Sequence, residues 1–556
     1  MSNGSSGKLR MIVMGLLVVA AAVTAIITLN RAPSTSLQED RLKTVPTPIE
    51  PAITAPLKDS SATPEILARG KAVFLSQCAV CHGTDGAGKG EAAYLLFPKP
   101  RNLTQRSFRL VSNLEGVVQV EDIFHTITRG MPGSAMPSWE ILPEQDRWAV
   151  AHYVNSLSRP DKRIPKPIPF GIEPPSTPES VQSGRKVFLV ACAACHGADA
   201  KGTPPQPQFD TDGYPSRPRD LTRGIFKGGR ESKQIFSRIA AGMLGSPMPS
   251  QISALDNTML WDVVHYVQSL SDPAADERTL QKFKTLTSSS SSAQNLNEPA
   301  SEAWTTIPST TLALMPLWWR DEHPEVLDVR TVHDDKDLYV RLSWSDPTHN
   351  DEQTIAQGFR DGAAVELAAG DTPPQFAMGA KGTPDVRIWY WKADRQADIG
   401  GRHDVHTTHP DMYVTTYPGL IKDKSASECM GVDFVGQRDA KNKEAQHLDK
   451  TFLTGIEARN VVSQINGCPV ESLTAHGLGT LDARPVSDQG VDAKGVWDKG
   501  TYSVVFRRPL QQSGEHAISL KEGDGVYIAF ACWDGNAGDR NGQKSVTIWQ
   551  RLQISK

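Results

Sequence analysis

The chain has 556 residues, of which 39% are hydrophobic and 22% are charged, and its formal net charge is −4. This length exceeds what a single hydrophobic core supports, so three or more units are expected. The small negative charge excludes a strongly basic nucleic-acid-binding protein, and the composition is typical of a folded globular protein.

An uncharged apolar run begins near the N-terminus and covers residues 11–29. It approaches the ~20 residues that cross a bilayer as a helix, and Lys8 and Arg10 before it favour a cytoplasmic N-terminus. Small residues in "AVTA" leave a cleaved signal peptide as the alternative, although a usual signal core has only ~7–15 residues. The sequence therefore predicts an anchor over residues 1–31 in a bacterial inner membrane, with the bulk of the chain in the periplasm. Cleavage would instead give a soluble periplasmic protein.

A spacer rich in Pro, Ser and Thr covers residues 32–62 and leads to two similar blocks. Matched positions recur at nearly constant spacing: His82 and His196 are 114 residues apart, and Met136 and Met248 are 112 apart. "RWAVAHYVNSL" in the first block matches "LWDVVHYVQSL" in the second. Each block begins and ends with a segment of helical periodicity, which predicts two small, mostly helical domains. These domains cover residues 63–160 and 179–275, with a Pro-rich linker over residues 161–178.

Each block contains one Cys-x-x-Cys-His motif. The motifs are "CAVCH" and "CAACH", formed by Cys78, Cys81 and His82 and by Cys192, Cys195 and His196. Such a motif attaches haem c, because two thiols add to the two vinyl groups of one porphyrin and the adjacent histidine becomes an axial iron ligand. A zinc site would need two further ligands at short range, and a redox-active Cys-x-x-Cys would not need the histidine twice. The sequence therefore predicts two covalent haem c groups.

A methionine is the expected sixth ligand of each iron. The candidates are Met131 or Met136 in "GMPGSAMPSW", and Met243 or Met248 in "GMLGSPMPSQ". The Met-Pro pair recurs in both blocks only at the second position, so we predict Met136 and Met248. An isolated methionine is usually core filler, but a Met-Pro at matched distance behind each haem motif favours ligation. His/Met ligation leaves no open position for substrate, which indicates electron transfer.

Strand patterns replace helical ones after residue 300. Segments such as "DLYVRLSWSD", "DVRIWYWKAD" and "GVYIAFACWD" alternate or run apolar over strand lengths, with turn residues between them. They predict an antiparallel β-sandwich over residues 301–556, with long loops between about residues 395 and 490. The stretch "LTSSSSSAQNLNEPA" predicts a flexible linker over residues 276–300. The expected fold is therefore multidomain, with a transmembrane helix, two all-α domains and an all-β sandwich.

The two helical blocks resemble class I cytochrome c domains from their first helix to their last. Within them, the matching segments "PRNLT" and "PRDLT" make Arg101 and Arg219 candidates to pair with haem propionates. An exposed arginine is the alternative at both positions.

The C-terminal region resembles the haem-binding subunit of ethylbenzene dehydrogenase and its relatives. The matching segments include "DLYVRLSWSDPT", "YSVVFRRPL" and "VYIAFACWDGNAGDRNGQKSVTIWQRLQI", whereas the middle of the region matches poorly. The resemblance implies a β-sandwich that holds one non-covalent haem b between a methionine and a lysine. By motif position these residues are Met378 in "FAMGA" and Lys544 in "NGQKS".

Iron ligation by Lys544 makes physical demands. A lysine binds iron only as the neutral amine, so burial and the metal have to lower its pKa from ~10.4. Trp533 and Trp549 nearby are expected to supply low dielectric and porphyrin contact, and Met378 follows "TPPQF", a loop able to bring sulfur to the other face. A solvated turn lysine is the alternative.

Further candidate groups lie in the C-terminal half. A rival metal-binding set consists of three loop histidines, His403, His406 and His409, although no strong helix pattern surrounds them and a solvated loop is the alternative. In an oxidising compartment Cys429 and Cys468 are a candidate disulfide. Cys532 in "IAFACW" is expected to be a buried free thiol.

Together these patterns predict a membrane-tethered, three-haem electron-transfer protein without catalytic residues of its own. The resemblance implies docking on the iron–sulfur subunit of an oxidoreductase that has a molybdopterin catalytic subunit. The haem c domains would extend the path to another cytochrome or membrane redox carrier, in a direction that the sequence leaves open. The alternatives are a dihaem enzyme with a vacant haem site and cytochromes fused to a carbohydrate-binding β-sandwich.

Overall fold

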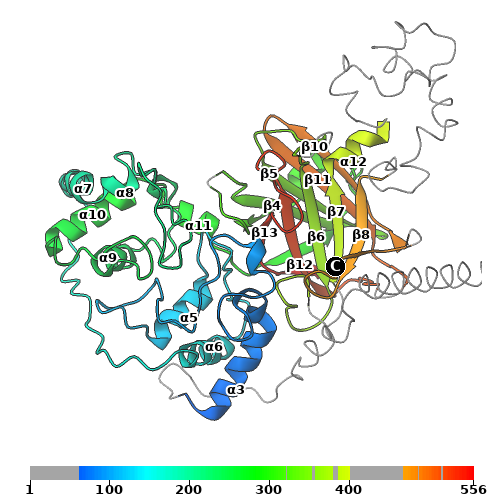
Figure 1. The fold of residues 1–556 in the computed structure, drawn as a ribbon. Coiled ribbons are helices and arrows are strands. Elements are labelled where there is room, and N and C mark those ends of the chain that lie inside the picture. Colours follow the sequence, from blue (N-terminus) through cyan, green and yellow to red (C-terminus); the bar gives the residue numbers. More distant parts are fainter. Residues whose placement is uncertain are drawn as a thin grey trace, which may run out of the picture. The chain divides into compact units, whose positions relative to one another are not determined.

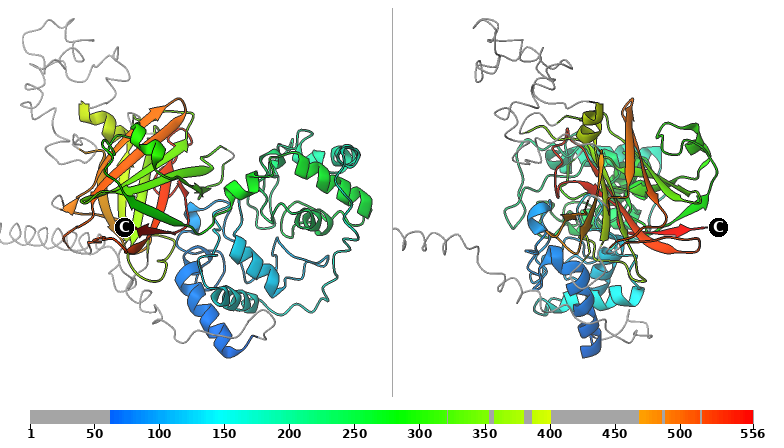
Figure 2. Two further views of the ribbon diagram at one scale, coloured as in Figure 1. Left: turned by 180° about the vertical axis from the view of Figure 1, so that it is seen from behind. Right: turned by 90° about the vertical axis from the view of Figure 1, so that its right-hand side faces the viewer.

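Helices occupy the first half of the described chain and strands the second (Figure 1). The computed structural model describes residues 62–320, 322–352, 357–379, 386–400, 468–485, 488–514 and 517–555. All of them belong to one unit, which extends from Pro51 to Lys556. The two helical domains and the strand-rich region remain separate in two further views (Figure 2).

Several predictions from the sequence concern residues outside these ranges. The apolar run at residues 11–29 is one of them, and so are Cys429 and the three loop histidines, His403, His406 and His409. Within the described ranges, no helix combines the length and apolar character that a bilayer span requires.

The first helical domain confirms the expected all-α character of the first block. Its elements are α3 (Pro64–Val73), the π-helical turn η1 (Phe74–Cys78), α4 (Ala79–His82), η2 (Ala93–Leu95), α5 (Val120–Arg129) and α6 (Glu144–Ser156). Thr63 begins α3, because its side-chain oxygen accepts a hydrogen bond from the Ile66 amide at 3.4 Å. Phe124 of α5 stacks on Trp148 of α6, with ring centroids 3.8 Å apart in the domain core.

The second helical domain repeats the main helices in the same order. Its elements are α7 (Pro178–Ala191), α8 (Ala193–His196), η3 (Leu221–Arg223), α9 (Ser232–Ala241) and α10 (Asn257–Ser269), and α11 (Ala275–Thr279) follows. Phe236 and Trp261, with ring centroids 4.6 Å apart, form the core pair that corresponds to the stacked pair of the first domain. The internal repeat therefore extends from the sequence to the packing.

A glycine lets the first and last helices of each helical domain approach closely. A Cβ atom on Gly70 of α3 would lie 2.0 Å from the Ala149 carbonyl oxygen of α6. One on Gly184 of α7 would lie 1.9 Å from the Asp262 carbonyl oxygen of α10. Only glycine fits where two backbones meet at such distances. Gly70 and Gly184 begin the matched segments "GKAVFLSQ" and "GRKVFLVA", so the repeat preserves this helix contact together with the haem motif.

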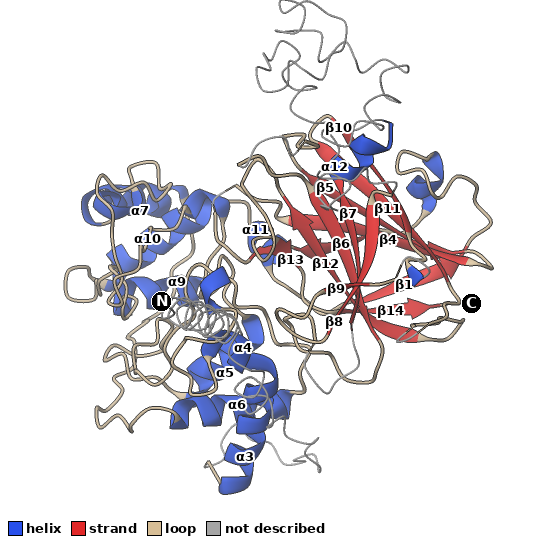
Figure 3. Ribbon diagram, turned by 45° about the vertical axis from the view of Figure 1, so that its right-hand side comes forward, coloured by secondary structure: helices blue, strands red, loops and turns tan. Residues whose placement is uncertain are grey.

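The C-terminal domain is a β-sandwich (Figure 3), and its strands other than β2, β3 and β13 form one hydrogen-bonded path. Its strands are β1 (Thr285–Ser290), β2 (Thr310–Ala313), β3 (Met315–Pro316), β4 (Val326–His333), β5 (Asp337–Ser345), β6 (Gly362–Ala368), β7 (Val386–Lys392), β8 (Val470–Ala475), β9 (Asp482–Ala483), β10 (Asp492–Asp498), β11 (Thr501–Pro509), β12 (Gly525–Trp533), β13 (Ser545–Val546) and β14 (Gln550–Ile554). The path runs β10-β11-β5-β4-β1-β14-β12-β6-β7-β8-β9. Short helices η4 (Glu302–Thr306), α12 (Ala393–Ala397) and η5 (Asp398–Gly400) complete the domain. Its pairs are antiparallel as predicted, except that β1 runs parallel to both β14 and β4.

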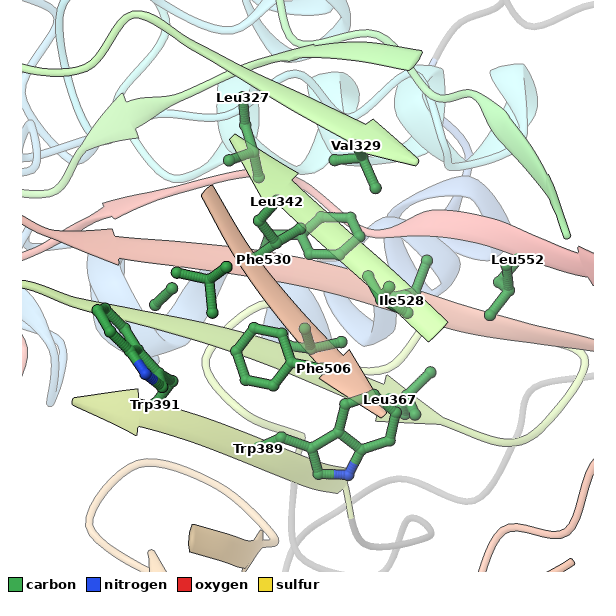
Figure 4. Close-up of a cluster of buried hydrophobic side chains, with 14 of the residues drawn as sticks. Leu327, Val329, Leu342, Leu367, Trp389, Trp391, Phe506, Ile528, Phe530 and Leu552 are labelled. Atoms are coloured by element: carbon green, nitrogen blue, oxygen red, sulfur yellow. The ribbon is translucent and has the colours of Figure 1, made fainter. Parts of the chain in front are cut away.

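The main core of the sandwich is built from alternate residues of the strands (Figure 4). In β12, Ile528 and Phe530 face this core, as Trp389 of β7 does. Their neighbours Ala529 and Ala531 belong to a second apolar cluster on the opposite face of the same layer. The outer face of an antiparallel layer is usually polar and solvated, whereas here it is apolar and its residues are buried.

The flexible linker predicted over residues 276–300 is wrong at its centre, because Thr285–Ser290 forms β1. This strand pairs on one side with β14 and on the other with β4. Leu286 enters the sandwich core, and the buried Ser288 hydroxyl lies 3.2 Å from Nδ1 of His333, within hydrogen-bonding distance. A serine run resembles a linker by composition, but paired backbone and a satisfied hydroxyl remove the cost of burying it.

Candidate haem sites

The first Cys-x-x-Cys-His motif lines a large, mostly apolar cavity in the first helical domain. Cys78 ends η1, and α4 then places Cys81 and His82 along the same wall. The empty volume is about 1310 Å³, including the open mouth of the cavity. Ordinary ligand pockets measure ~300–1,000 Å³, so the cavity suits a group as large as a porphyrin.

Hydrogen bonding prepares His82 to bind iron. Its Nδ1 atom lies 3.1 Å from the backbone oxygen of Arg101. A carbonyl oxygen only accepts hydrogen bonds, so Nδ1 carries the proton and the lone pair of Nε2 is available to a metal. Burial lowers the pKa of His82 against a raising effect of the Arg101 backbone, which favours the neutral imidazole that ligation requires.

The second motif lines a matching cavity in the second helical domain. Cys192, Cys195 and His196 lie on its wall, and its empty volume is about 1400 Å³. Burial lowers the pKa of His196, and the backbone of Arg219 opposes that shift as Arg101 does at His82. The two cavities therefore share the arrangement of the motif that the repeat predicts, although Nδ1 of His196, unlike that of His82, makes no hydrogen bond of ordinary geometry.

Both candidate methionines of each domain reach the cavity wall. Met131 and Met136 line the first cavity, and Met243 and Met248 line the second. One backbone hydrogen bond closes each methionine loop, from Met131 N to Met136 O at 3.0 Å and from Met243 N to Met248 O at 3.1 Å. Met136 and Met248 also pack against the apolar cores of their domains, and their choice over Met131 and Met243 stays a prediction.

Cationic side chains lie where the two cavities approach each other. Arg109 and Lys227 line both cavities. Arg109 pairs with Asp210 at 2.8 Å, and Arg101 pairs with Asp212 at 3.0 Å, so both ion pairs join the two helical domains. Burial, followed by neighbouring arginines, holds the pKa of Lys227 well below its usual value. Asp210 and Asp212 balance the two arginines, and a haem propionate beside Lys227 would favour its ammonium form.

Arg101 and Arg219, the predicted propionate partners, each line their own cavity and also reach into the other domain. The Nη2 atom of Arg219 donates to the Gly133 carbonyl oxygen at 2.9 Å. A Cβ atom on Gly245 would lie 3.3 Å from Nη1 of Arg101. Each arginine thus contacts the methionine loop of the other domain, and the reciprocal contacts hold the two cavities in a defined relation.

The outer face of one sandwich layer carries an apolar platform. Along β6, β7, β8 and β12, platform residues alternate with residues that face the sandwich core. The platform includes Ala364, Ala368, Val386, Ile388, Leu473, Tyr527, Ala529, Ala531, Trp533 and Trp549. Ala364 and Ala531 are direct partners across β6 and β12.

Lys544 and Glu366 bring charge to this platform. Lys544 follows the turn after β12 and is partly exposed as a residue, but its amine lies 4.8 Å from the centroid of the Trp533 ring. Glu366 lies opposite Ala529, and its Oε1 atom is buried without a hydrogen-bond partner. Burial lowers the pKa of Lys544 and raises the pKa of Glu366 to about 8, and each residue opposes the shift of the other. An inward-facing lysine with a lowered pKa favours ligation over the solvated-turn alternative.

Met378 reaches the same platform from a loop. Its side chain packs against the platform cluster, and its backbone φ is 62°, in the left-handed region that residues other than glycine rarely adopt. The Met378 carbonyl oxygen accepts a hydrogen bond from the Gly477 amide at 2.9 Å, which holds this conformation. Strain of this kind is concentrated at functional positions. The structure therefore brings the two predicted haem b ligands, Met378 and Lys544, to one apolar face.

Phe376, two residues before Met378, touches two sites at once. It packs against the platform cluster and also lines the first helical cavity. Its ring centroid lies 6.4 Å from that of Trp139 in the first helical domain. The sequence carries no signal for this role, because the contact joins segments more than 200 residues apart.

The remaining cysteines differ in their surroundings. Cys532 is 1% exposed within β12, which confirms the predicted burial, and burial raises the pKa of its thiol well above the usual value. Such a thiol is unreactive. Cys468 is exposed, and its predicted disulfide partner Cys429 lies outside the described residues.

Comparison with known proteins agrees with this division of the chain. A family model described as cytochrome c matches residues 67–158 and 181–271, and one described as ethylbenzene dehydrogenase matches residues 300–545. A respiratory nitrate reductase heme subunit of Haloferax mediterranei is 26% identical, over 45% of this chain and 66% of its own length. The dimethylsulfide dehydrogenase subunit gamma of Rhodovulum sulfidophilum is 27% identical, over 45% and 72%. The cbb3-type cytochrome c oxidase subunit FixP of Bradyrhizobium sp. (strain ORS 278) is 31% identical, over 39% and 67%. The chain thus spans about two thirds of the length of these relatives.

Two haem-motif cavities followed by a sandwich with a ligand platform define a haem protein of electron transfer, and not a catalytic subunit. The chain belongs to the cytochrome c family through its two helical domains, and it carries an ethylbenzene dehydrogenase-type domain behind them. Its cytochrome c domains imply covalently bound haem c.

Proposed function

We propose that this chain is a three-haem electron-transfer subunit of a molybdoenzyme complex. Two covalent haem c groups belong to the helical cavities and one non-covalent haem b belongs to the platform; when bound, they supply one-electron chemistry. The observation that carries the proposal is that Met378 and Lys544 each contact the apolar platform, in a chain with two haem c cavities. A pyridine haemochrome spectrum of the full chain tests it and should give two c-type haems for each b-type haem. A chain with c-type haem alone would contradict it.

The relatives support a choice of partners. One is described as a subunit of dimethylsulfide dehydrogenase, one as a heme subunit of nitrate reductase, and a third as chlorate reductase subunit gamma. We therefore propose a molybdopterin catalytic subunit and an iron–sulfur subunit as partners on the platform side. Another cytochrome or membrane redox carrier is the proposed partner of the helical domains.

The order of the three sites follows from the residues that they share. Phe376 belongs to both the platform and the first cavity, and Arg109 and Lys227 belong to both cavities. These shared residues favour the first helical domain as the middle of the path, although Arg219 of the second domain also lies over the Trp319 ring of the C-terminal region, at 4.4 Å. Phe376 at one junction, and Arg109 and Lys227 at the other, each contact both neighbouring sites. Electron transfer between these sites therefore needs no separate docking of one domain on the next.

The Phe376→Ala substitution is expected to slow electron transfer between the sandwich and the first helical domain several-fold. It removes the ring that packs against both sites, so their spacing is less well held. Stopped-flow reduction through the native partner complex, followed in the c-type absorption bands, measures the effect. The Phe283→Ala variant is the control, because this ring is 38% exposed and precedes β1. Equal rates in Phe376→Ala and wild type, with all haems retained, would show that the path does not pass this residue.

We further propose that residues 11–29 anchor the chain in the inner membrane and leave the bulk of it in the periplasm. The support is the uncharged run behind Lys8 and Arg10. The protein should then stay in the membrane fraction after a high-salt wash. A mature N-terminus near residue 30 would instead establish a cleaved signal peptide.

A further inference from the structure

Three carboxylates meet where strands of the sandwich begin and end. Asp346 directly follows β5, Asp361 directly precedes β6, and Asp534 directly follows β12. One oxygen atom from each residue lies within 4.8 Å of the other two. Asp346 and Asp361 are 1% and 0% exposed, and Asp534 is half-buried. Residues nearly 190 positions apart in the sequence thus form one buried acidic cluster.

Hydrogen bonds orient these carboxylates without neutralising them. In Asp361, Oδ1 accepts from the Gly535 amide at 2.8 Å and Oδ2 accepts from the Tyr502 hydroxyl at 2.9 Å. In Asp346, Oδ1 accepts from the Thr348 amide at 3.0 Å, whereas Oδ2 is buried and, like the nearby Trp344 Nε1 atom, makes no hydrogen bond of ordinary geometry. Among the residues that the structure describes, no lysine or arginine forms an ion pair with any of the three.

The electrostatics of the cluster call for a positive charge. Burial raises the pKa of Asp361 to about 7, with Asp346 as the second cause. Burial also raises the pKa of Asp346; the backbone hydrogen bond from Thr348 is the largest opposing effect, and the charge of Asp534 adds to the rise. Buried like charges are costly unless a proton or a cation compensates them. The unpartnered Oδ2 atom of Asp346 is the position where a cation would gain most.

We propose that Asp346, Asp361 and Asp534 bind a divalent cation, and that Ca²⁺ is the ion that fits. Ca²⁺ takes oxygen ligands at ~2.3–2.6 Å, so two ligands on opposite sides of it are up to ~5 Å apart. The ligand atoms of the cluster lie within 4.8 Å of one another, which is inside that span. The Thr348 hydroxyl and the Asn350 side-chain oxygen, 3.0 Å apart, supply neutral oxygens beside Asp346.

The cation holds the turn that leads to Lys544. Asp534 begins this turn, and Gly535 donates to Asp361. Near the other end of the turn, Asp539 forms a bidentate ion pair with Arg320, with both contacts at 2.7 Å. A cation on Asp534 would therefore fix the start of a turn whose end is already fixed. This consequence rests on the proposed haem b site, whereas the cation site itself does not.

The first experiment measures thermal unfolding of the full chain after EGTA treatment and after re-addition of Ca²⁺. We expect Ca²⁺ to raise the unfolding temperature by several degrees, since an ion that binds only the folded state stabilises it. Tb³⁺ in place of Ca²⁺ should show luminescence excited through tryptophan, because the Trp497 Nε1 atom lies 2.9 Å from the Asp346 carbonyl oxygen. EGTA should also lower retention of haem b without affecting the covalent haems.

The Asp346→Asn variant distinguishes a cluster that binds a cation from one in which the carboxylates only share a proton. The amide can keep the oxygen that bonds Thr348 and place nitrogen where Oδ2 has no partner. If the cluster binds Ca²⁺, the variant loses the Ca²⁺ response and the Tb³⁺ signal. If the cluster only shares a proton, the variant unfolds at a higher temperature than wild type, because repulsion is relieved, and EGTA has no effect on either protein.

Asp351→Asn is the matched control, since Asp351 is a nearby carboxylate outside the cluster whose partner is His349 at 3.7 Å. It should keep the full Ca²⁺ response. A wild-type chain without Ca²⁺ stabilisation or Tb³⁺ luminescence would overturn the cation site. A clear Ca²⁺ response with haem b retention unchanged in EGTA would leave the cation site intact and overturn its link to Lys544.

Discussion

Replacing Lys544 by alanine or by arginine is expected to remove the b-type haem while both covalent haems stay at full occupancy. Alanine has no ligand atom, and arginine keeps its proton in proteins, so neither residue can donate a lone pair to iron. The Lys544 amine lies over Trp533, and burial lowers its pKa toward the neutral form that ligation needs. The pyridine haemochrome ratio of c-type to b-type haem, two to one in the wild type, measures the loss.

Function should fail in the same variants in a specific way. Electrons from the proposed molybdoenzyme partner should no longer reach the c-type haems, whereas small chemical reductants should still reduce them. Lys521→Ala is the control, because Lys521 is an exposed lysine in the loop before β12. If Lys544→Ala keeps stoichiometric haem b with an unchanged low-spin spectrum, Lys544 is only a turn lysine. The histidines at 403, 406 and 409 would then be the next ligands to test.

Replacing Met136 or Met248 by histidine is expected to lower one haem potential and leave the covalent haem in place. Thioether attachment through the two cysteines does not depend on the sixth ligand, and methionine sulfur favours ferrous iron more than imidazole does. Axial ligands tune haem potentials over ~0.8 V, so a shift on the order of 0.1 V or more is expected in each variant. Spectroelectrochemical titration of the full chain measures it.

Each domain supplies its own control for this experiment. Met131 and Met243 line the same cavities as Met136 and Met248, five residues earlier in each loop. Met131→His and Met243→His should therefore leave both potentials nearly unchanged. Potentials that move in these two variants, and stay constant in Met136→His and Met248→His, would reverse the assignment within each loop.

The serine-rich composition of one strand led to a wrong prediction of a linker. The serine run at Thr285–Ser290 resembles a linker, yet it forms β1 between β14 and β4. Serine is tolerated there because the backbone groups are paired on both sides and the buried Ser288 hydroxyl has a partner in His333. A strand of this kind is recognised only from its neighbours, since its own side chains bury little apolar area.

The sequence by itself determined the two haem c sites and the layout of the domains. A Cys-x-x-Cys-His motif works through adjacent residues, because thioether formation and histidine placement depend on spacing along the chain. The repeat of helices and the period-two pattern of strands are local signals of the same kind. For these reasons His82, His196 and the helical and strand halves were predictable before any contact between distant segments was known.

Only the tertiary structure decided how the sites are joined and charged. Phe376 connects the platform to the first cavity, Lys227 lies between two cavities, and Asp346 meets two other carboxylates, all through segments far apart in the sequence. Whether Lys544 is a surface cation or an inward-facing amine was equally undecided, because a pKa depends on burial and neighbouring charges. Burial and charge neighbours arise only when distant segments pack together, so no local pattern records them.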